Sequence, residues 1–217
     1  MKLEVNVPTS LNEITLGQYQ KYLSIAENNE EGNFLDAKMI EIFCGIPLSD
    51  SYKLKMSSAT AILDILSELL SETPQHQPTF KMNDVEYGFI PDLNEMSLGE
   101  YIDLDNTASN WNTMHTAMSV LYRPIKTKQG NRYNIEDYAI GNDEKYKDMP
   151  LGVAIGSLFF FYNLGMDLSK HTILYSASPE EKEIIQQQLT LDKSGGGINQ
   201  FMGSLTEILQ DLKISLN

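Results

Sequence analysis

The sequence contains one cysteine, three histidines and few basic residues, and each shortage excludes a class of protein. A single cysteine, Cys44, excludes an intramolecular disulfide framework and a zinc site built on several thiolates. Lys and Arg number 16 against 30 Asp and Glu, which gives a formal net charge of -14. Because an acidic surface repels phosphate backbones, we expect no direct binding to nucleic acid.

Long apolar runs are also missing. The most apolar segment, Leu151–Met166, is shorter than the roughly 20 residues that a membrane-spanning helix needs, and Asn163 interrupts it. Met1–Val5 places an acidic residue among apolar ones and is not typical of a secretory signal. We therefore expect no membrane association and a reducing cytoplasmic setting.

Motifs for catalysis, cofactor binding and metal binding are absent from the sequence. His76, His115 and His171 lie far apart, and none belongs to a His-x-x-x-His pair. No serine occupies a Gly-x-Ser-x-Gly motif. The Ser194–Gly197 run lacks the Lys-Ser/Thr pair of a phosphate-binding loop and is expected to be a hinge. Cys44 lies in an apolar run and is expected to be a buried, unreactive thiol. We predict no enzyme, no cofactor and no metal.

Two acidic residues leave one catalytic alternative open. Asp103 and Asp105 lie in the acidic segment 100–105, and a pair of carboxylates can hold a divalent cation. On a chain with this excess of acidic residues, such pairs also arise as a solvated surface. A small metal-dependent enzyme or regulator is therefore kept as an alternative.

One stretch of nine residues occurs twice. Leu11–Tyr19 is Leu-Asn-Glu-Ile-Thr-Leu-Gly-Gln-Tyr, and Leu93–Tyr101 is Leu-Asn-Glu-Met-Ser-Leu-Gly-Glu-Tyr. We call these stretches the first motif and the second motif. In each, Thr or Ser is followed three residues later by Gln or Glu, the pattern of a capping box, in which each side chain binds the other residue's backbone N–H. Each motif is therefore predicted to begin a helix.

The residues around each capping box suggest two further contacts. Ile14 and Met96 precede the boxes and are placed to pack against the tyrosine that ends each motif, as a hydrophobic staple. The Asn-Glu pairs at 12–13 and 94–95 either form a recurring polar contact site or only solvate the turn before the helix. The sequence leaves both interpretations of these pairs open.

Apolar periodicity predicts a mainly helical chain with short strands. Helices are expected at 16–28, 34–44, 57–71, 98–105, 110–121, 149–164, 179–189 and 198–214, with helical continuation through 167–177. Strands are expected at 3–7, 79–82 and 85–89, and a second hairpin at 125–138. A helix, a second helix and a proline recur in order after each motif. This order predicts a duplicated helical-bundle module.

The prolines of segment 73–78 mark the best internal boundary, because they cannot continue a helix. The predicted fold class is mainly α, with a duplicated helical-bundle module and short β-hairpins as a minor component. The expected parts are a first helical module at 1–73, a second helical module with the β-hairpins at 79–175, and a C-terminal helical hairpin at 176–217.

The hairpin expected at 125–138 is basic, although the chain as a whole is acidic. Its three basic residues could bind an acidic patch on a neighbouring copy, or the hairpin could be an ordinary solvated one. The apolar segment 150–166 could be a buried central helix or could be covered by another subunit, and the tail after Gly195 is a further candidate contact. The residues predicted to bind a partner are Lys126, Lys128, Arg132, Tyr133, Phe160 and Phe161.

Three segments carry a recognisable pattern. They are Met-His-Thr-Ala-Met-Ser-Val-Leu-Tyr-Arg-Pro at Met114–Pro124, Tyr-Asn-Ile-Glu-Asp-Tyr at Tyr133–Tyr138, and Phe-Phe-Phe-Tyr-Asn-Leu-Gly at Phe159–Gly165. With the Leu-Gly-Glu-Tyr of the second motif, they resemble small acidic proteins encoded among the virion and tail-assembly genes of tailed bacteriophages.

The resemblance implies a non-catalytic structural or assembly protein of the head–tail connector, tail or baseplate. Its partners would be other phage structural proteins or further copies of itself, and it would be located in the virion or the host cytoplasm. A tail assembly chaperone that is not retained in the virion is an alternative. An intracellular adaptor outside phages is a third interpretation.

Overall fold

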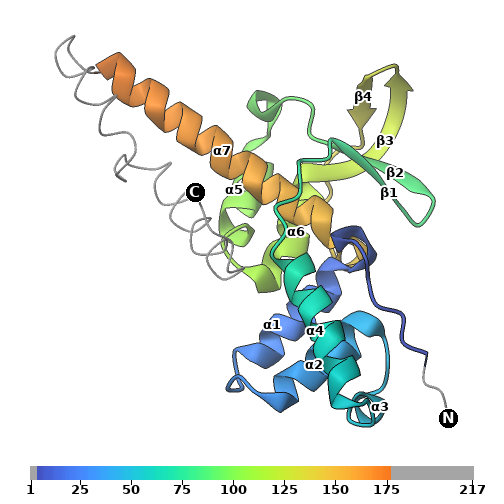
Figure 1. Ribbon diagram of the computed structural model, residues 1–217. Coiled ribbons are helices and arrows are strands. Elements are labelled where there is room, and N and C mark those ends of the chain that lie inside the picture. Colours follow the sequence, from blue (N-terminus) through green and yellow to red (C-terminus); the bar gives the residue numbers. More distant parts are fainter. Residues whose placement is uncertain (1–3, 177–217) are drawn as a thin grey trace.

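A computed structural model describes residues 4–176 of the protein, with side chains through residue 164. The described chain is mainly α-helical with one small β-sheet (Figure 1). Its α-helices are α1 (Leu16–Ala26), α2 (Asn33–Cys44), α3 (Leu48–Ser51), α4 (Met56–Leu70), α5 (Leu98–Thr107), α6 (Met114–Leu121) and α7 (Leu151–Ser176). Its 3-10 helices are η1 (Leu11–Glu13), η2 (Leu93–Glu95), η3 (Trp111–Thr113) and η4 (Glu144–Asp148). The helices expected at 179–189 and 198–214 and the tail after Gly195 lie outside the described residues.

Both motifs form the predicted capping box. In the first, the Thr15 N–H donates to Gln18 Oε1 at 2.9 Å, and the Gln18 N–H donates to Thr15 Oγ1 at 3.1 Å. In the second, the corresponding bonds between Ser97 and Glu100 measure 2.7 and 3.3 Å. A 3-10 turn precedes each box, so the two helices begin in the same way. The prediction that each motif begins a helix is confirmed.

The two predicted hairpins join in one antiparallel sheet with strand order β1-β2-β3-β4. The strands are β1 (Thr79–Met82), β2 (Val85–Phe89), β3 (Tyr122–Gln129) and β4 (Arg132–Ile135). The turn between β1 and β2 has positive φ at Asn83 and Asp84, as in the hairpin turns that match strand twist. Phe89 pairs with Tyr122 across β2 and β3. This pairing joins the two hairpins, although the segment that contains α5 and α6 separates them in the sequence. The sequence does not predict it.

The strand predicted at 3–7 is wrong, because residues 4–9 adopt no regular structure. Val5 and Val7 are partly buried against the core, which accounts for the alternation of apolar residues. A strand also needs backbone partners, and no strand of the described chain lies beside this segment. The alternation therefore reflects packing on one side of an irregular segment.

The first turns of α7 lie at the centre of the core, where residues 151–159 are all buried. Two glycines let neighbouring segments approach them. A Cβ on Gly152 would lie 2.5 Å from Asn12 Oδ1, and one on Gly156 would lie 2.6 Å from the Gln75 carbonyl oxygen. The later turns of α7 extend away from the body (Figure 1). Between residues 4 and 176, no helix has the length and apolarity needed to cross a membrane.

Both sides of the predicted boundary at 73–78 contribute to the same hydrophobic core. Leu66 of α4 and Phe80 of β1 belong to one cluster of buried side chains, together with Leu151 at the start of α7. The boundary segment itself has no helix or strand, as its prolines require. The division into three parts stays a prediction.

Candidate interaction surface

The first motif buries the face of α1 that carries Leu16, Tyr19 and Gln20. The Tyr19 ring lies edge-on to the Trp111 ring, with the two centroids 4.9 Å apart. Gln20 Nε2 donates to the Trp111 carbonyl oxygen at 2.6 Å and lies 3.0 Å from Nδ1 of His115. These bonds satisfy a buried amide, so a polar residue is accommodated in this contact. The second half of the chain thus covers the first motif.

The segment before α7 also lies along the first motif. The Leu16 N–H donates to the Met149 carbonyl oxygen at 2.8 Å, and the Leu151 N–H donates to the Ile14 carbonyl oxygen at 2.8 Å. The two bonds form an isolated antiparallel bridge at Pro150. The four side chains that flank the bridge are fully buried: Ile14, Leu16, Met149 and Leu151. An extended segment is therefore held against the start of α1 by backbone bonds and apolar packing.

The corresponding face of the second motif is exposed. Leu98 is 74% exposed, Tyr101 is 59% exposed and Ile102 is 47% exposed. Because residues three and four apart are neighbours on a helix, these side chains form one stripe, which we call the α5 face. Apolar surface with polar residues around it is typical of contact sites for other proteins. The α5 face is therefore the strongest candidate interaction surface of the described chain.

The opposite side of α5 is anchored by an ion pair. Glu100 Oε1 lies 2.6 Å from Arg123 Nη1, and these two side chains are only 7% and 10% exposed. Burial raises the pKa of Glu100, but hydrogen bonds from Ser97 and the Arg123 guanidinium outweigh burial, so the pKa lies below its usual value. The pair fixes which side of α5 faces the solvent.

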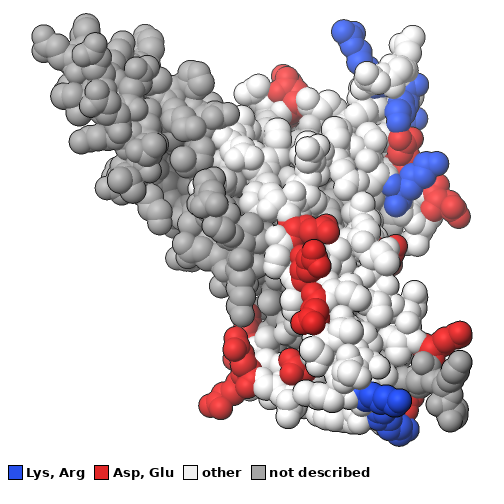
Figure 2. Space-filling view, in the orientation of Figure 1, with Lys and Arg blue, Asp and Glu red and all other residues white. Residues whose placement is uncertain are grey.

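The α5 face lies in an acidic part of the chain. The sequence has no Lys or Arg between Lys81 and Arg123. Glu95 and Asp105, on either side of the face, are exposed, and Asp103 accepts a hydrogen bond from the hydroxyl of Tyr138 at 2.8 Å. Basic side chains lie instead over the tips of the two hairpins, with acidic side chains among them, and in the region of α3 (Figure 2).

The basic hairpin predicted to bind a partner is β3–β4. Lys126 pairs with Asp137 at 3.1 Å, and Lys128 pairs with Glu86 of β2. Arg132 is exposed and forms no ion pair with any described residue. Two of the three positive charges are therefore offset within the chain, and the hairpin presents less net charge than its sequence suggests.

The three aromatic residues predicted to bind a partner are half-buried. The Tyr133 hydroxyl lies 3.0 Å from the Phe89 carbonyl oxygen, and its ring lies over Gly88, where a Cβ would be 2.5 Å away. Phe160 and Phe161 each lie beside the Phe89 ring, with centroids 5.7 and 5.8 Å away. These side chains join β4 and α7 to β2. Their role towards a partner stays a prediction.

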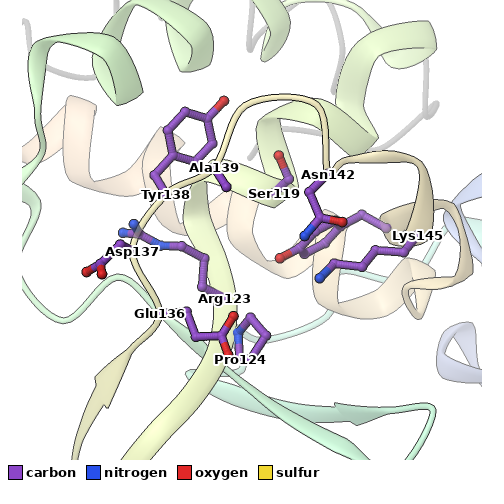
Figure 3. Close-up of a pocket in the computed structure, with 10 residues that line it drawn as sticks. Ser119, Arg123, Pro124, Glu136, Asp137, Tyr138, Ala139, Asn142 and Lys145 are labelled. Carbon is purple, nitrogen blue, oxygen red and sulfur yellow. The ribbon is translucent and has the colours of Figure 1, made fainter.

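A small cavity opens beside Arg123, the basic partner of Glu100 (Figure 3). Its volume is about 40 Å³, which suits a water molecule and is far below the roughly 300 Å³ of a small-molecule site. Arg123, Lys145, Glu136 and Asp137 line it, so charges of both signs meet there. Nε of Arg123 is buried without a hydrogen-bond partner among the described residues. The cavity can hydrate this ion pair.

The groups with reactive potential are dispersed. Cys44 is buried, and burial raises the pKa of its thiol to about 11, so the reactive thiolate is disfavoured. His115 lies between α1 and η4, and burial lowers its pKa, with the charge of Lys147 adding to the effect. In the part of the chain that was described, no three His, Cys, Asp or Glu residues converge as metal ligands would. The side chain of His171 lies outside that part.

Comparison with protein families, with curated proteins and with solved structures finds no match to this chain. The candidate interaction surface therefore rests on the geometry of this chain alone. The sequence alone does not indicate the α5 face, although Leu98, Tyr101 and Ile102 follow helical spacing. The signal that could have indicated this face is a second apolar stripe on the helix. Leu104 and Ala108 already supply the buried side of α5, so Leu98, Tyr101 and Ile102 are additional apolar residues.

Proposed function

We propose that the protein is a non-catalytic structural or assembly protein of a tailed bacteriophage, acting in the head–tail connector, tail or baseplate through protein–protein contacts. The sequence resemblance of Met114–Pro124, Tyr133–Tyr138 and Phe159–Gly165 supports the phage context. The α5 face supports the mode of action, and it is the observation that carries the proposal.

The strength of this support comes from the comparison of the two motifs. Leu16, Tyr19 and Ile14 of the first motif are at most 4% exposed. Leucine and tyrosine recur at the positions of Leu16 and Tyr19 in the second motif, but there Leu98 and Tyr101 remain in solvent. Burying a leucine side chain is worth about 1.5–3 kcal/mol, so a partner that covers this face gains a substantial free energy.

We also propose that the chain is a duplicated module. Besides the shared capping box, the third helical residue of each motif reaches the end of the following helix. Gln18 Nε2 donates to the Ile42 carbonyl oxygen at 2.7 Å near the end of α2. Glu100 pairs with Arg123 just after α6. Both contacts join the capping residue to the region where the next helix ends, and they differ in chemistry, as expected if two copies diverged from one unit.

Substitution of Leu98 by Asp tests the proposed mode of action. The residue is exposed, so the variant should fold as the unsubstituted chain does and should fail to support particle assembly in complementation of a phage that lacks the gene. Met56→Asp is the matched control, because Met56 is an apolar residue of α4 that is 76% exposed. Equal assembly with Leu98→Asp and Met56→Asp would overturn the proposal.

Mass spectrometry of the purified particles separates a virion component from an assembly chaperone. A component is present at a fixed copy number per particle, and a chaperone is absent.

Replacing Lys126, Lys128 and Arg132 by Glu tests the basic hairpin in the assembly assay. Unchanged assembly would remove the hairpin from the contact surface.

A further inference from the structure

Gly17 and Gly99 occupy the same position of the two motifs but have different surroundings. A Cβ on Gly17 would lie 3.0 Å from both the Cβ and the carbonyl oxygen of Lys147. The first motif therefore favours glycine at this position, because the segment before α7 passes directly over it. A Cβ on Gly99 would meet nothing within 4 Å. The second motif keeps a glycine that no described neighbour requires, although glycine disfavours a helix.

The backbone groups that hold the docked segment in the first motif have open counterparts in the second. The Leu16 N–H and the Ile14 carbonyl bind Met149 and Leu151. The equivalent groups are the Leu98 N–H and the carbonyl of Met96, which make no backbone hydrogen bond outside their own helix within residues 4–176. Met96 and Ser97 are extended, with ψ of 129° and 159°. Their counterparts in the first motif, Ile14 and Thr15, are extended as well, with ψ of 135° and 152°. The second motif thus presents the same binding edge without its occupant.

Building on the proposed function, we propose that the second motif binds an extended segment of a partner protein. The segment carries an aliphatic–proline–aliphatic sequence preceded by basic residues. It lies over Gly99 and pairs with the Leu98 N–H and the Met96 carbonyl in the antiparallel register that Met149–Leu151 adopts on the first motif. Its aliphatic side chains cover the α5 face.

Charge favours a partner protein over a second copy of this chain. The α5 face is bordered by exposed acidic residues, Glu95 and Asp105, and two copies would each carry a net charge of -14. The segment docked on the first motif has Lys145 and Lys147 ahead of Met149, but Asp143, Glu144 and Asp148 offset these charges, and Lys147 pairs with Glu144. The basic character proposed for the partner segment therefore comes from the acidic border of the α5 face. In each copy the docked segment is already held by its own first motif. A basic segment of a different protein satisfies both the geometry and the charge.

A labelled peptide with the sequence of residues 145–153 of this chain and the substitution Asp148→Ser is the probe, because residues 143–153 as they stand contain three acidic residues against two lysines. Added to the full-length protein, it should bind saturably with one site per chain, as measured by fluorescence anisotropy. Leu98→Asp and Gly99→Leu should weaken binding about tenfold or more, as expected for the centre of a contact surface. Met56→Asp should leave it unchanged. Peptides with Asp at 149 and 151, or with Glu at 145 and 147, should bind more weakly.

Hydrogen exchange at the Leu98 amide locates the bound peptide, because this N–H should become protected only when the peptide is added. Binding that is unaffected by Gly99→Leu, or the absence of saturable binding, would overturn the inference. Protection of the Leu98 amide in the free chain would also overturn it. Protection that depends on protein concentration would assign the face to a second copy, and protection that does not would assign it to residues of the same chain. The Leu98→Asp assembly assay is independent of the peptide, so the proposed function can stand if this inference fails.

Discussion

The Glu100–Arg123 ion pair should be essential for the position of α5. Glu100→Gln is expected to destabilise the fold by about 2–3 kcal/mol. Glutamine can still bind the Ser97 N–H, as Gln18 does for Thr15 in the first motif, so the capping box is retained. What is lost is the negative charge beside a guanidinium that is 10% exposed. Removing one partner of a buried pair costs about 3–5 kcal/mol, and we expect a lower cost here because the cavity beside Arg123, of about 40 Å³, has room for a water molecule.

A double-mutant cycle isolates the ion pair from other effects of the substitution. Arg123→Met keeps much of the side-chain volume and leaves Glu100 with its bonds to Ser97. The double variant should be more stable than the sum of the two single effects implies, with a coupling free energy of about 2 kcal/mol. Urea unfolding followed by circular dichroism at pH 7 measures each variant. Glu95→Gln removes a charge at an exposed position and should change stability by less than about 0.5 kcal/mol.

The pH dependence of unfolding provides a second measurement of the same pair. Because the pKa of Glu100 in the fold lies below its usual value, the carboxylate contributes stability above the unfolded pKa near 4.5. That contribution is lost as pH falls through the lower, folded pKa. Glu100→Gln should therefore reduce the acid sensitivity of the fold. Additive single effects, together with a Glu100→Gln midpoint equal to that of Glu95→Gln, would refute the claim that the pair anchors α5.

Two further predictions concern the first motif and the buried histidines. Gly17→Ala should lower the urea midpoint, because a Cβ 3.0 Å from Lys147 costs about 1–3 kcal/mol of overpacking, against a helix-propensity gain of at most about 1 kcal/mol. Gly99→Ala should leave the midpoint equal or higher. A loss of stability in Gly99→Ala would contradict the open surroundings of Gly99. Burial lowers the pKa of His76 and His115, so the unfolded chain takes up protons at these residues more readily than the fold does. Stability should therefore fall as pH drops below about 6.5. His76→Phe should lessen that fall in unfolding measured between pH 5 and pH 8.

Local features of the fold could be predicted from the sequence because their causes are local. A capping box requires two residues three apart, so Thr15 and Ser97 were sufficient to place the starts of α1 and α5. The Asn83-Asp84 turn likewise depends on residues that tolerate positive φ. The pairing of Phe89 with Tyr122 depends on where α5 and α6 carry the chain. No local sequence pattern indicates that these two distant segments pair, so the single sheet could not be predicted.

The candidate surface was missed for a related reason. The first and second motifs have almost the same sequence, and exposure is set by what else packs on them. The first motif is covered by Trp111 and by Met149–Leu151, which are far away in the sequence. The basic hairpin was predicted from charge alone, and the pairing of one of its charges, Lys128, with Glu86 depends on the same long-range pairing of β2 and β3. Sequence patterns therefore predicted the elements, whereas their contacts required the fold.

One difference between the motifs supports a covered state of the α5 face. Gln20 of α1 is 7% exposed, and its counterpart in α5 is Ile102, which is 47% exposed. Contact with water alone would favour the opposite arrangement, with the polar residue on α5 and the apolar residue on α1. Gln20 is tolerated in the core because Trp111 and His115 satisfy its amide. Ile102 gains nothing from solvent, and a partner that covers the α5 face gives its side chain the apolar contact that the isolated chain leaves unmade.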